Sequence, residues 1–226
     1  MTGDRPSKGD EFLAARQVLH HSRWQQAVKR AIDVLVAVPV FLLLLPGFAV
    51  IGLLAKAESP GPVLYTDRRL GRGGCVFTCL KFRTMRHDSE HILQAYLQAH
   101  PELQERWAKY KKLPDDPRVT RAGRWLRKTT LDEFPQVVNI LRGEMSILGP
   151  RPFMQREAGE LEPYAAEILS MRPGMAGMWI AHGRSSLTFE QRIQLELDYV
   201  RHWSLGLDLI VFWKSVVALI TARGAH

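Results

Sequence analysis

Cysteine is scarce in this sequence, with only Cys75 and Cys79 among 226 residues. Both lie in one apolar stretch, and the second pair of thiols that a structural zinc site would need is missing. We therefore expect two reduced thiols in the core of a domain that faces the cytoplasm.

Charge is absent from the run between Val34 and Ala55. A straight helix over this run would reach roughly 30 Å, about the thickness of the bilayer hydrocarbon. Pro39 and Pro46 argue against a straight span, because an interior proline removes a backbone hydrogen bond and favours a kink. Length alone thus allows a span, whereas the prolines favour a break.

Lysine and arginine flank the apolar run on both sides, which keeps both flanks in the cytoplasm under the positive-inside rule. A helix-break-helix with its break at Pro46, dipping into the cytoplasmic leaflet, satisfies both flanks. A secretory signal is the alternative, but the run is longer than a signal core and begins late.

The formal net charge of +8 suits an anionic partner, which includes nucleic acid, an anionic bilayer surface and phosphorylated substrates. No nucleic-acid-binding motif accompanies the six tryptophans, so we expect no nucleic-acid partner. The glycines at 71, 73 and 74 lack the Gly-Lys-Ser/Thr of a phosphate-binding Walker loop and predict a hairpin turn.

The pattern of apolar residues predicts a domain of mixed helices and strands. We expect a compact α/β (α+β) fold that is not of the Rossmann type. Strands over 63–70 and 75–85 form a hairpin, and a helical region over 87–112 is broken near Pro101. Further helices are expected over 132–142 and 188–203. Residues 205–220 predict an amphipathic interfacial helix, with a buried core helix as the alternative. The chain divides into a basic polar segment (1–28), the membrane helix (29–58) and a cytoplasmic domain (59–226).

Adjacent acids, Asp132 and Glu133, stand just ahead of Pro135. Proline is tolerated in the first helical turn, so a helix is expected to begin at about Asp132 and to end at Gly143. In one interpretation Asp132 is only the N-cap. In the other, a carboxylate at this position attacks phosphorus. Since adjacent helical residues point about 100° apart, Glu133 would then have a different task, such as holding a metal ion.

Basic side chains surround the acidic pair in sequence, at Arg124, Arg127, Lys128 and Arg151. Phosphoryl transfer needs cations that offset the charge on the phosphate oxygens. Arg151 lies between two prolines that stiffen its backbone, although a solvated arginine in a Pro-x-Pro turn is the alternative.

Several motifs in a fixed order resemble the bacterial sugar transferase family, the small monotopic phosphoglycosyl transferases. They are KRAIDVL, SPGPVLY, KFRTM, DPRVTRAGRWLRKTTLDEFPQ, NILRGEMSILGPRP, RPGMAG and GRSSLTFEQRIQLELDYVRHWSLGLDL. The resemblance implies transfer of a phospho-sugar from a UDP-sugar to undecaprenyl (polyprenyl) phosphate, at the cytoplasmic face of the bacterial inner membrane. It also implies a re-entrant membrane helix, with Pro46 at the matching break.

By resemblance, Asp132 is the nucleophile, Glu133 binds Mg²⁺ together with Asp132, and Lys81, Arg127 and Arg151 bind phosphate. The lipid bilayer is a further partner, and a homodimer is considered. The segment from Met178 to Gly183 departs from the pattern GLWQVSGRS that is common in members acting on glucose or galactose, which makes His182 unusual. The sugar, the pathway and the oligomeric state do not follow from the sequence. Two alternatives stay open: a non-catalytic adaptor at the membrane surface, and a Mg²⁺-dependent phosphohydrolase.

Overall fold

A computed structural model of the chain describes residues 22–110, 113, 115–182 and 187–221. The described residues divide into two compact units. The first comprises those within Met1–Leu43, Thr66–Leu80 and Pro135–Ala225, and the second those within Leu44–Tyr65 and Lys81–Phe134. The segment GRSS at 183–186 and most of the basic N-terminal segment fall outside the described residues.

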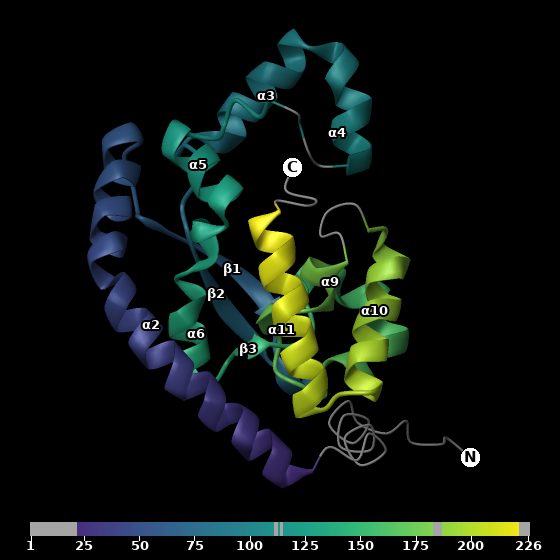
Figure 1. Cartoon of the computed structure of the whole chain (residues 1–226). Helices are drawn as coiled ribbons and strands as arrows, with labels where there is room; N and C mark the ends of the chain where they lie inside the picture. Colours follow the sequence, from purple (N-terminus) through teal and green to yellow (C-terminus); the bar gives the residue numbers. More distant parts are fainter. Residues whose placement is uncertain (1–21, 111–112, 114, 183–186, 222–226) are drawn as a thin grey trace. The chain divides into compact units, whose positions relative to one another are not determined.

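Helices dominate both units (Figure 1). The α-helices are α2 (Arg23–Glu58), α3 (Ser89–Ala99), α4 (Gln104–Tyr110), α5 (Arg121–Thr129), α6 (Gln136–Arg142), α7 (Ala158–Leu161), α8 (Ala165–Ile168), α9 (Met178–Ala181), α10 (Phe189–Arg201) and α11 (Leu205–Ile220). Short 3-10 turns are η1 (Arg72–Gly74), η2 (Pro101–Leu103), η3 (Leu131–Glu133), η4 (Gln155–Glu157) and η5 (Glu162–Tyr164).

Two small sheets complete the mixed helix and strand architecture that the sequence predicts. Strands β1 (Leu64–Leu70) and β2 (Val76–Phe82) form the expected hairpin around the glycine turn. Strands β3 (Ser146–Leu148) and β4 (Gly174–Ala176) pair in parallel, with Ser146 opposite Gly174 and Leu148 opposite Ala176. The thiols differ from expectation, because Cys79 is buried whereas Cys75 is exposed.

The helix α2 runs without interruption through Pro39 and Pro46. The break in helical structure that we expected at Pro46 is therefore not present. A proline inside a helix removes one hydrogen bond and can bend the helix without ending it, so a bend at Pro46 stays a prediction. The helix also begins at Arg23, earlier than the boundary we drew at residue 29.

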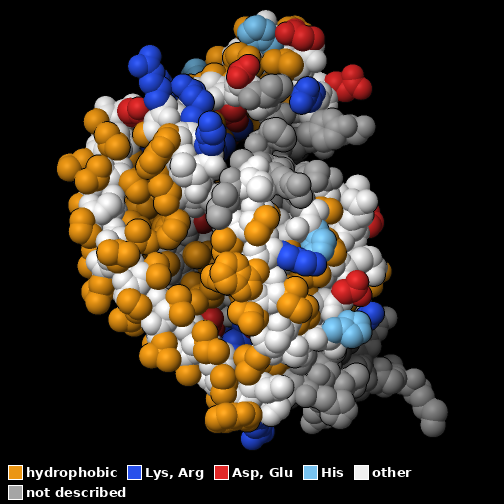
Figure 2. Space-filling view, in the orientation of Figure 1, with side chains coloured by type: hydrophobic (Ala, Val, Ile, Leu, Met, Phe, Trp, Pro, Cys, Tyr) orange, Lys and Arg blue, Asp and Glu red, His pale blue; other side chains and the backbone are white. Residues whose placement is uncertain are grey.

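The length and composition of α2 are sufficient to cross a bilayer, and only 6% of its most apolar window is buried. A core helix of a soluble protein would bury most of this surface. Because α2 lies near the N-terminus, a signal sequence would share these properties. Figure 2 shows hydrophobic side chains along its exposed surface.

Helix α11 packs one side against α9 and β3 and leaves other apolar side chains in the open. Val211 and Ser215 are buried, whereas Leu209, Ile210 and Trp213 are exposed. The helix is thus not the fully buried core helix of the alternative prediction, and its hydrophobic exposed face is visible in Figure 2.

A buried ion pair joins the start of α2 to the start of α11 within the first unit. Lys29 Nζ lies 2.5 Å from Asp208 Oδ2. The other carboxylate oxygen of Asp208 accepts hydrogen bonds from Tyr199 Oη at 2.6 Å and Trp203 Nε1 at 3.1 Å. Asp208 is thereby compensated on both oxygens, as a buried charge requires.

In the second unit, α5 approaches the strand segment after β2 so closely that only glycine fits between them. A Cβ on Gly123 would lie 2.1 Å from the backbone oxygen of Thr84. Thr120 caps α5 by accepting a hydrogen bond from Gly123 N, and Thr120 N donates to Thr84 O at 3.0 Å. These contacts determine where α5 lies in its unit.

The buried ion pair predicts a large loss of stability for Lys29→Met. This change leaves the Asp208 charge without its cation, and breaking one side of a buried pair costs about 3–5 kcal/mol. Urea unfolding of the purified protein measures the loss. In Lys29→Met/Asp208→Asn the neutral amide still accepts from Tyr199 and Trp203, so we expect much of the stability to return. Equal stability of wild type and Lys29→Met would contradict this account.

The close approach of α5 predicts that Gly123→Ala destabilises the protein, because the added methyl meets a backbone oxygen that must move. Overpacking of this kind costs about 1–3 kcal/mol. Thermal unfolding measures it, with Gly159→Ala as the matched control, since a Cβ there has nothing within 4 Å. The control should differ from wild type by no more than about 1 kcal/mol. A Gly123→Ala protein as stable as the control would disprove the steric argument.

Candidate active site

The acidic pair occupies a tight turn between α5 and α6. Asp132 and Glu133 both lie in η3, where Glu133 N donates to Thr130 O at 3.3 Å and Phe134 N to Leu131 O at 3.2 Å. These bonds span three residues, so the α-helix itself begins only at Gln136, with Pro135 at the N-cap. The expected helix start at Asp132 is therefore wrong, and Asp132 is not the N-cap. The predicted end at Gly143 is confirmed.

A single strained residue turns the chain from α5 into this acidic turn. Thr130 has a φ of 61°, which is the one positive φ of a non-glycine residue among those described. Left-handed backbone is unfavourable for a β-branched side chain. The conformation lets Thr130 N cap α5 by donating to Arg127 O and Leu126 O. Strain of this kind is commonly found beside functional residues.

Lys81 forms an ion pair with the second acid of the pair. Its Nζ lies 2.6 Å from Glu133 Oε1, and both side chains are partly buried. The other carboxylate oxygen, Oε2, is not part of this contact. Lys81 therefore orients Glu133 and brings a positive charge next to the acidic turn, as expected for a residue at a phosphate site.

The first acid of the pair has an altered pKa. Burial, together with the negative charge of Glu133, raises the pKa of Asp132 to about 6, although Lys81 and Arg127 act in the opposite direction. Because Asp132 lies next to a second carboxylate and beside two cations, its pKa differs strongly from that of a free aspartate. Such perturbation is typical of catalytic groups.

Arg127 is anchored from the strand segment after β2, in the same unit as the acidic pair. Its Nε donates to Thr84 Oγ1 at 2.9 Å. Nearby, Arg118 binds Asp116 through Nε at 2.8 Å and Nη2 at 2.6 Å, and its guanidinium lies 4.8 Å from the ring of Trp107. Sequence reasoning assigned no role to Thr84, Asp116 or Arg118. The KFRTM and DPR motifs contain them, but their mutual placement required the fold.

The KFRTM segment combines structural and site residues. Arg83 donates to the carbonyl oxygens of Ser59 and Pro60, which holds the end of α2. Lys81 and Thr84 instead reach Glu133 and Arg127. Lys81 is therefore not simply a solvated residue of a strand face, because it is partly buried and paired with Glu133.

Arg151 belongs to the first unit, whereas Lys81, Arg127 and the acidic pair belong to the second. Its Nη1 donates to Glu157 Oε2 at 2.9 Å, and its guanidinium lies 5.2 Å from the ring of Phe153. Arg151 contributes to lowering the pKa of Glu157, although burial acts in the opposite direction. Arg151 is thus a fixed side chain and not the solvated arginine of the alternative interpretation.

Glu196 on α10 is a second buried acid that sequence reasoning missed. It is fully buried, and burial raises its pKa to about 8 while Arg151 and Arg192 act in the opposite direction. A carboxyl with this pKa is mostly protonated at neutral pH. Its helical spacing from the buried Ile193 and Val200 is the signal that could have found it, because an acid on the apolar face of a helix is unusual.

A magnesium ion would find suitable oxygens at the acidic turn. Among the described residues, no group of three or more His, Cys, Asp or Glu side chains could hold a metal ion without help. Mg²⁺, however, is commonly held by one or two carboxylates together with substrate phosphates and water. Asp132 and Glu133 fit that requirement. His182 lies outside this turn, at the end of α9, where its Nδ1 is 3.0 Å from Met178 O.

Comparison with known proteins gives one consistent family. The profile of the bacterial sugar transferase family matches residues 24–222. The exopolysaccharide production protein ExoY of Sinorhizobium fredii is 43% identical over 199 residues, which are 88% of this chain and 88% of that protein.

Two further relatives carry more specific names. The UDP-glucose:undecaprenyl-phosphate glucose-1-phosphate transferase of Caulobacter vibrioides is 36% identical over 88% of this chain and 72% of its own length. The undecaprenyl-phosphate galactose phosphotransferase of Salmonella typhimurium is 34% identical over 90% of this chain and 43% of its own length. The matched range includes the acidic turn and every cation described above. The chain therefore belongs to the bacterial sugar transferase family, as the order of its motifs indicated, and it is a phosphoglycosyl transferase.

Proposed function

We propose that this protein transfers a phospho-sugar from a UDP-sugar to undecaprenyl phosphate and releases UMP. The names of the relatives from Caulobacter vibrioides and Salmonella typhimurium support the acceptor and the class of reaction. The main structural support is the acidic turn, where Asp132 has a raised pKa beside a Glu133 that Lys81 orients. The product would begin the assembly of a bacterial polysaccharide or glycoconjugate.

The proposed mechanism has two displacements at one phosphorus atom. A carboxylate oxygen of Asp132 attacks the sugar-bearing phosphorus, and the bond from that phosphorus to the bridging oxygen breaks as UMP leaves with the electron pair. An oxygen of undecaprenyl phosphate then attacks the same phosphorus and displaces Asp132. The lipid diphospho-sugar departs, and the free carboxylate is restored.

The pKa of Asp132 suits this role. Near neutral pH a carboxyl with a pKa of about 6 is mostly ionised, yet it is more basic than a free aspartate. Greater basicity makes a carboxylate a better nucleophile, whereas protonation would remove the attacking electron pair. The carboxylate must therefore be more basic than a free aspartate and still be ionised near neutral pH. Burial beside Glu133 and two cations gives Asp132 both properties.

The basic residues would bind the phosphates and offset the charge that builds on their oxygens. Lys81 and Arg127 lie in the same unit as the nucleophile, where Lys81 donates a hydrogen bond to Glu133 and Arg127 donates one to Thr84. Arg151, fixed by Glu157, is proposed as a third phosphate ligand. Mg²⁺, held by Glu133 with Asp132, would supply further positive charge to the phosphate oxygens.

We also propose that the protein is monotopic, with α2 re-entering the cytoplasmic face of the inner membrane. The exposed apolar surface of α2 and the basic residues on both its flanks support this placement. A bend at Pro46 would let both ends of α2 stay in the cytoplasm. The exposed Leu209, Ile210 and Trp213 of α11 would lie in the interface, where tryptophan is favoured.

The covalent mechanism predicts that the first displacement proceeds without a lipid acceptor. Enzyme mixed with its UDP-sugar and Mg²⁺ should release about one UMP per active site and gain the mass of a phospho-sugar. Mass spectrometry of peptides should place that mass on Asp132. A UDP-sugar panel identifies the donor first. Continuous UMP release without acceptor would indicate a phosphohydrolase instead, and no release with any donor would favour the adaptor.

Matched variants separate the tasks of the two acids. Asp132→Asn keeps the size of the side chain but lacks the anionic nucleophile, so it should fold with an unchanged melting temperature and form no adduct. Glu133→Gln should retain some adduct formation but need more Mg²⁺, because its role is to hold the ion. Full turnover by Asp132→Asn, or an adduct on another residue, would overturn the assignment.

The re-entrant topology predicts that both ends of α2 are protected from an impermeant thiol reagent in intact cells. Single cysteines at Ser22 and Ala57, both exposed positions, are placed in a Cys75→Ser/Cys79→Ala background. Labelling after permeabilisation is the positive control for each. Labelling of Ser22→Cys alone in intact cells would show a full span. Pro46→Ala should shift part of the population towards that span, because the helix regains a hydrogen bond and straightens.

A further inference from the structure

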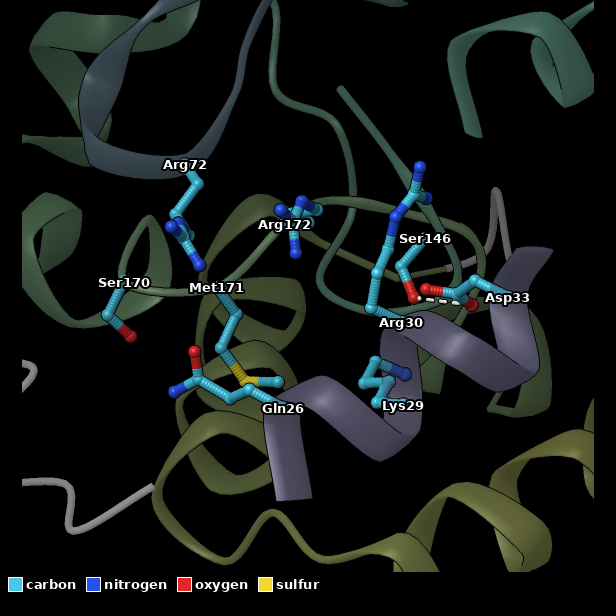
Figure 3. Close-up of a pocket in the computed structure, with 9 residues that line it drawn as sticks. All are labelled: Gln26, Lys29, Arg30, Asp33, Arg72, Ser146, Ser170, Met171 and Arg172. Carbon is cyan, nitrogen blue, oxygen red and sulfur yellow. Dashed lines mark hydrogen bonds between the residues drawn. The ribbon is translucent and has the colours of Figure 1, made fainter. Parts of the chain in front are cut away.

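Helix α2 is anchored separately in each of its two halves. The half that ends at Leu43 belongs to the first unit, where Figure 3 shows Asp33 accepting a hydrogen bond from Ser146 Oγ at 3.0 Å. The half that begins at Leu44 belongs to the second unit, together with the acidic turn. The contacts of this second half are therefore the ones that bear on the candidate active site.

The segment 81–84 contacts both the candidate active site and α2. Its outer residues reach the site, because Lys81 donates a hydrogen bond to Glu133 and Thr84 accepts one from Arg127. Its two inner residues are buried, and they contact α2 and the residues that directly follow this helix. A displacement of the inner residues would therefore displace the outer ones as well.

The first inner residue, Phe82, packs against Phe48 of α2. The two ring centroids lie 5.2 Å apart with an angle of 76° between the ring planes, which is an edge-to-face arrangement. Phe82 is only 3% exposed. Phe48 lies two residues beyond Pro46, so this contact holds α2 just after the position where a bend is predicted.

The second inner residue, Arg83, holds the chain where α2 ends. Its Nη1 donates to Pro60 O at 2.5 Å and its Nη2 to Ser59 O at 2.6 Å. A cation is favoured beside the last carbonyl groups of a helix, where the helix dipole is negative. The fit is close, because a Cβ on Gly61 would lie 2.6 Å from Arg83 Nη1, and the φ of 113° at Gly61 also favours glycine.

The last residue of α2 also contacts α5. Both carboxylate oxygens of Glu58 accept from Ala122 N, at 3.2 and 3.1 Å. An anionic side chain is favoured at this place, in the first turn of a helix. Since α5 carries Arg127, the end of α2 contacts both chain segments that bring a cation to the acidic turn.

We propose that Arg83 is a positioning residue for the phospho-sugar transfer, through which the end of the membrane helix α2 fixes Lys81 and Arg127 beside the acidic turn. The proposal rests on the chemistry proposed above. Arg83 touches no substrate and acts through its neighbours in the segment 81–84. A displacement of about 1 Å at a reacting phosphate can slow a reaction about a hundredfold, so this support matters for the rate.

The test measures adduct formation by the full-length protein with its UDP-sugar and Mg²⁺, in a single turnover without lipid acceptor. Arg83→Gln should lower the rate at saturating UDP-sugar about a hundredfold, because both cations lose their fixed position. Arg83→Lys keeps the charge and should recover about tenfold of this loss. Arg86→Gln removes the same charge from an exposed position and should react like wild type. A wild-type rate in Arg83→Gln would overturn the proposal.

A change in α2 itself tests whether the helix determines the site. Phe48→Ala removes the ring that packs against Phe82, so the rate of adduct formation should fall about tenfold. Leu53→Ala removes an apolar side chain that is 70% exposed on the same half of α2, and it should have no effect. Equal rates in these two variants would show that α2 does not position the site.

A purely structural role of Arg83 predicts a different result. Leu93→Ala opens a cavity in the same unit and should lower the melting temperature, but the rate per folded molecule should stay normal. In a Lys81→Met background, Arg83→Gln should cost less than about tenfold, because one of the side chains that it positions is already absent. Losses that multiply fully would show that Arg83 supports only the fold.

Failure of this proposal can be distinguished from failure of the proposed chemistry. If the wild type forms no phospho-sugar adduct with any UDP-sugar, the chemistry is refuted and the positioning role falls with it. If the wild type forms the adduct and both Arg83→Gln and Phe48→Ala form it equally fast, the chemistry stands and the positioning role is refuted.

Discussion

The candidate active site depends on one close backbone contact, between Gly123 on α5 and the carbonyl oxygen of Thr84. No larger residue fits at position 123, because its Cβ would lie 2.1 Å from that oxygen. The contact places α5 so that Arg127 reaches Thr84 Oγ1 and so that the helix ends at the strained Thr130. The acidic turn follows directly, within reach of Lys81 from β2. A small change in the packing of α5 would therefore alter the charge environment of Asp132.

The surroundings of buried acids differ between Asp208 and the acidic turn. At the buried Asp208 both carboxylate oxygens have partners, namely Lys29 on one and Tyr199 and Trp203 on the other. Around the acidic turn two carboxylates lie beside two cations, and burial together with the charge of Glu133 raises the pKa of Asp132. A buried carboxyl with a raised pKa is unfavourable for stability but is useful for a group that must react.

Helices α2 and α11 both combine an exposed apolar surface with a buried ion pair. Apolar side chains on α2 and α11 remain exposed, whereas Lys29 and Asp208 connect the beginnings of the two helices through a buried pair. The pair fixes these helix ends without covering their apolar surfaces. Water makes such exposure unfavourable, and the proposed contact with lipid would remove that cost.

The sequence alone determined the family, the hairpin around Gly73, the end of α6 at Gly143 and the candidate residues of the acidic pair. These features depend on local chemistry, because a motif, a glycine in a left-handed turn or a proline can be recognised from a short stretch of sequence. The start of α6, the continuous path of α2 through Pro46 and the exposure of Cys75 were not predicted correctly, since local signals were compatible with more than one backbone.

Only the tertiary structure decided which residues meet. Lys81 and Glu133 are 52 positions apart, and Arg127 and Thr84 are 43 apart, so no periodicity relates them. Their contacts exist because α5 packs against the segment after β2. The raised pKa of Asp132 likewise arises from burial and from charges that the fold brings together, which a residue type cannot encode.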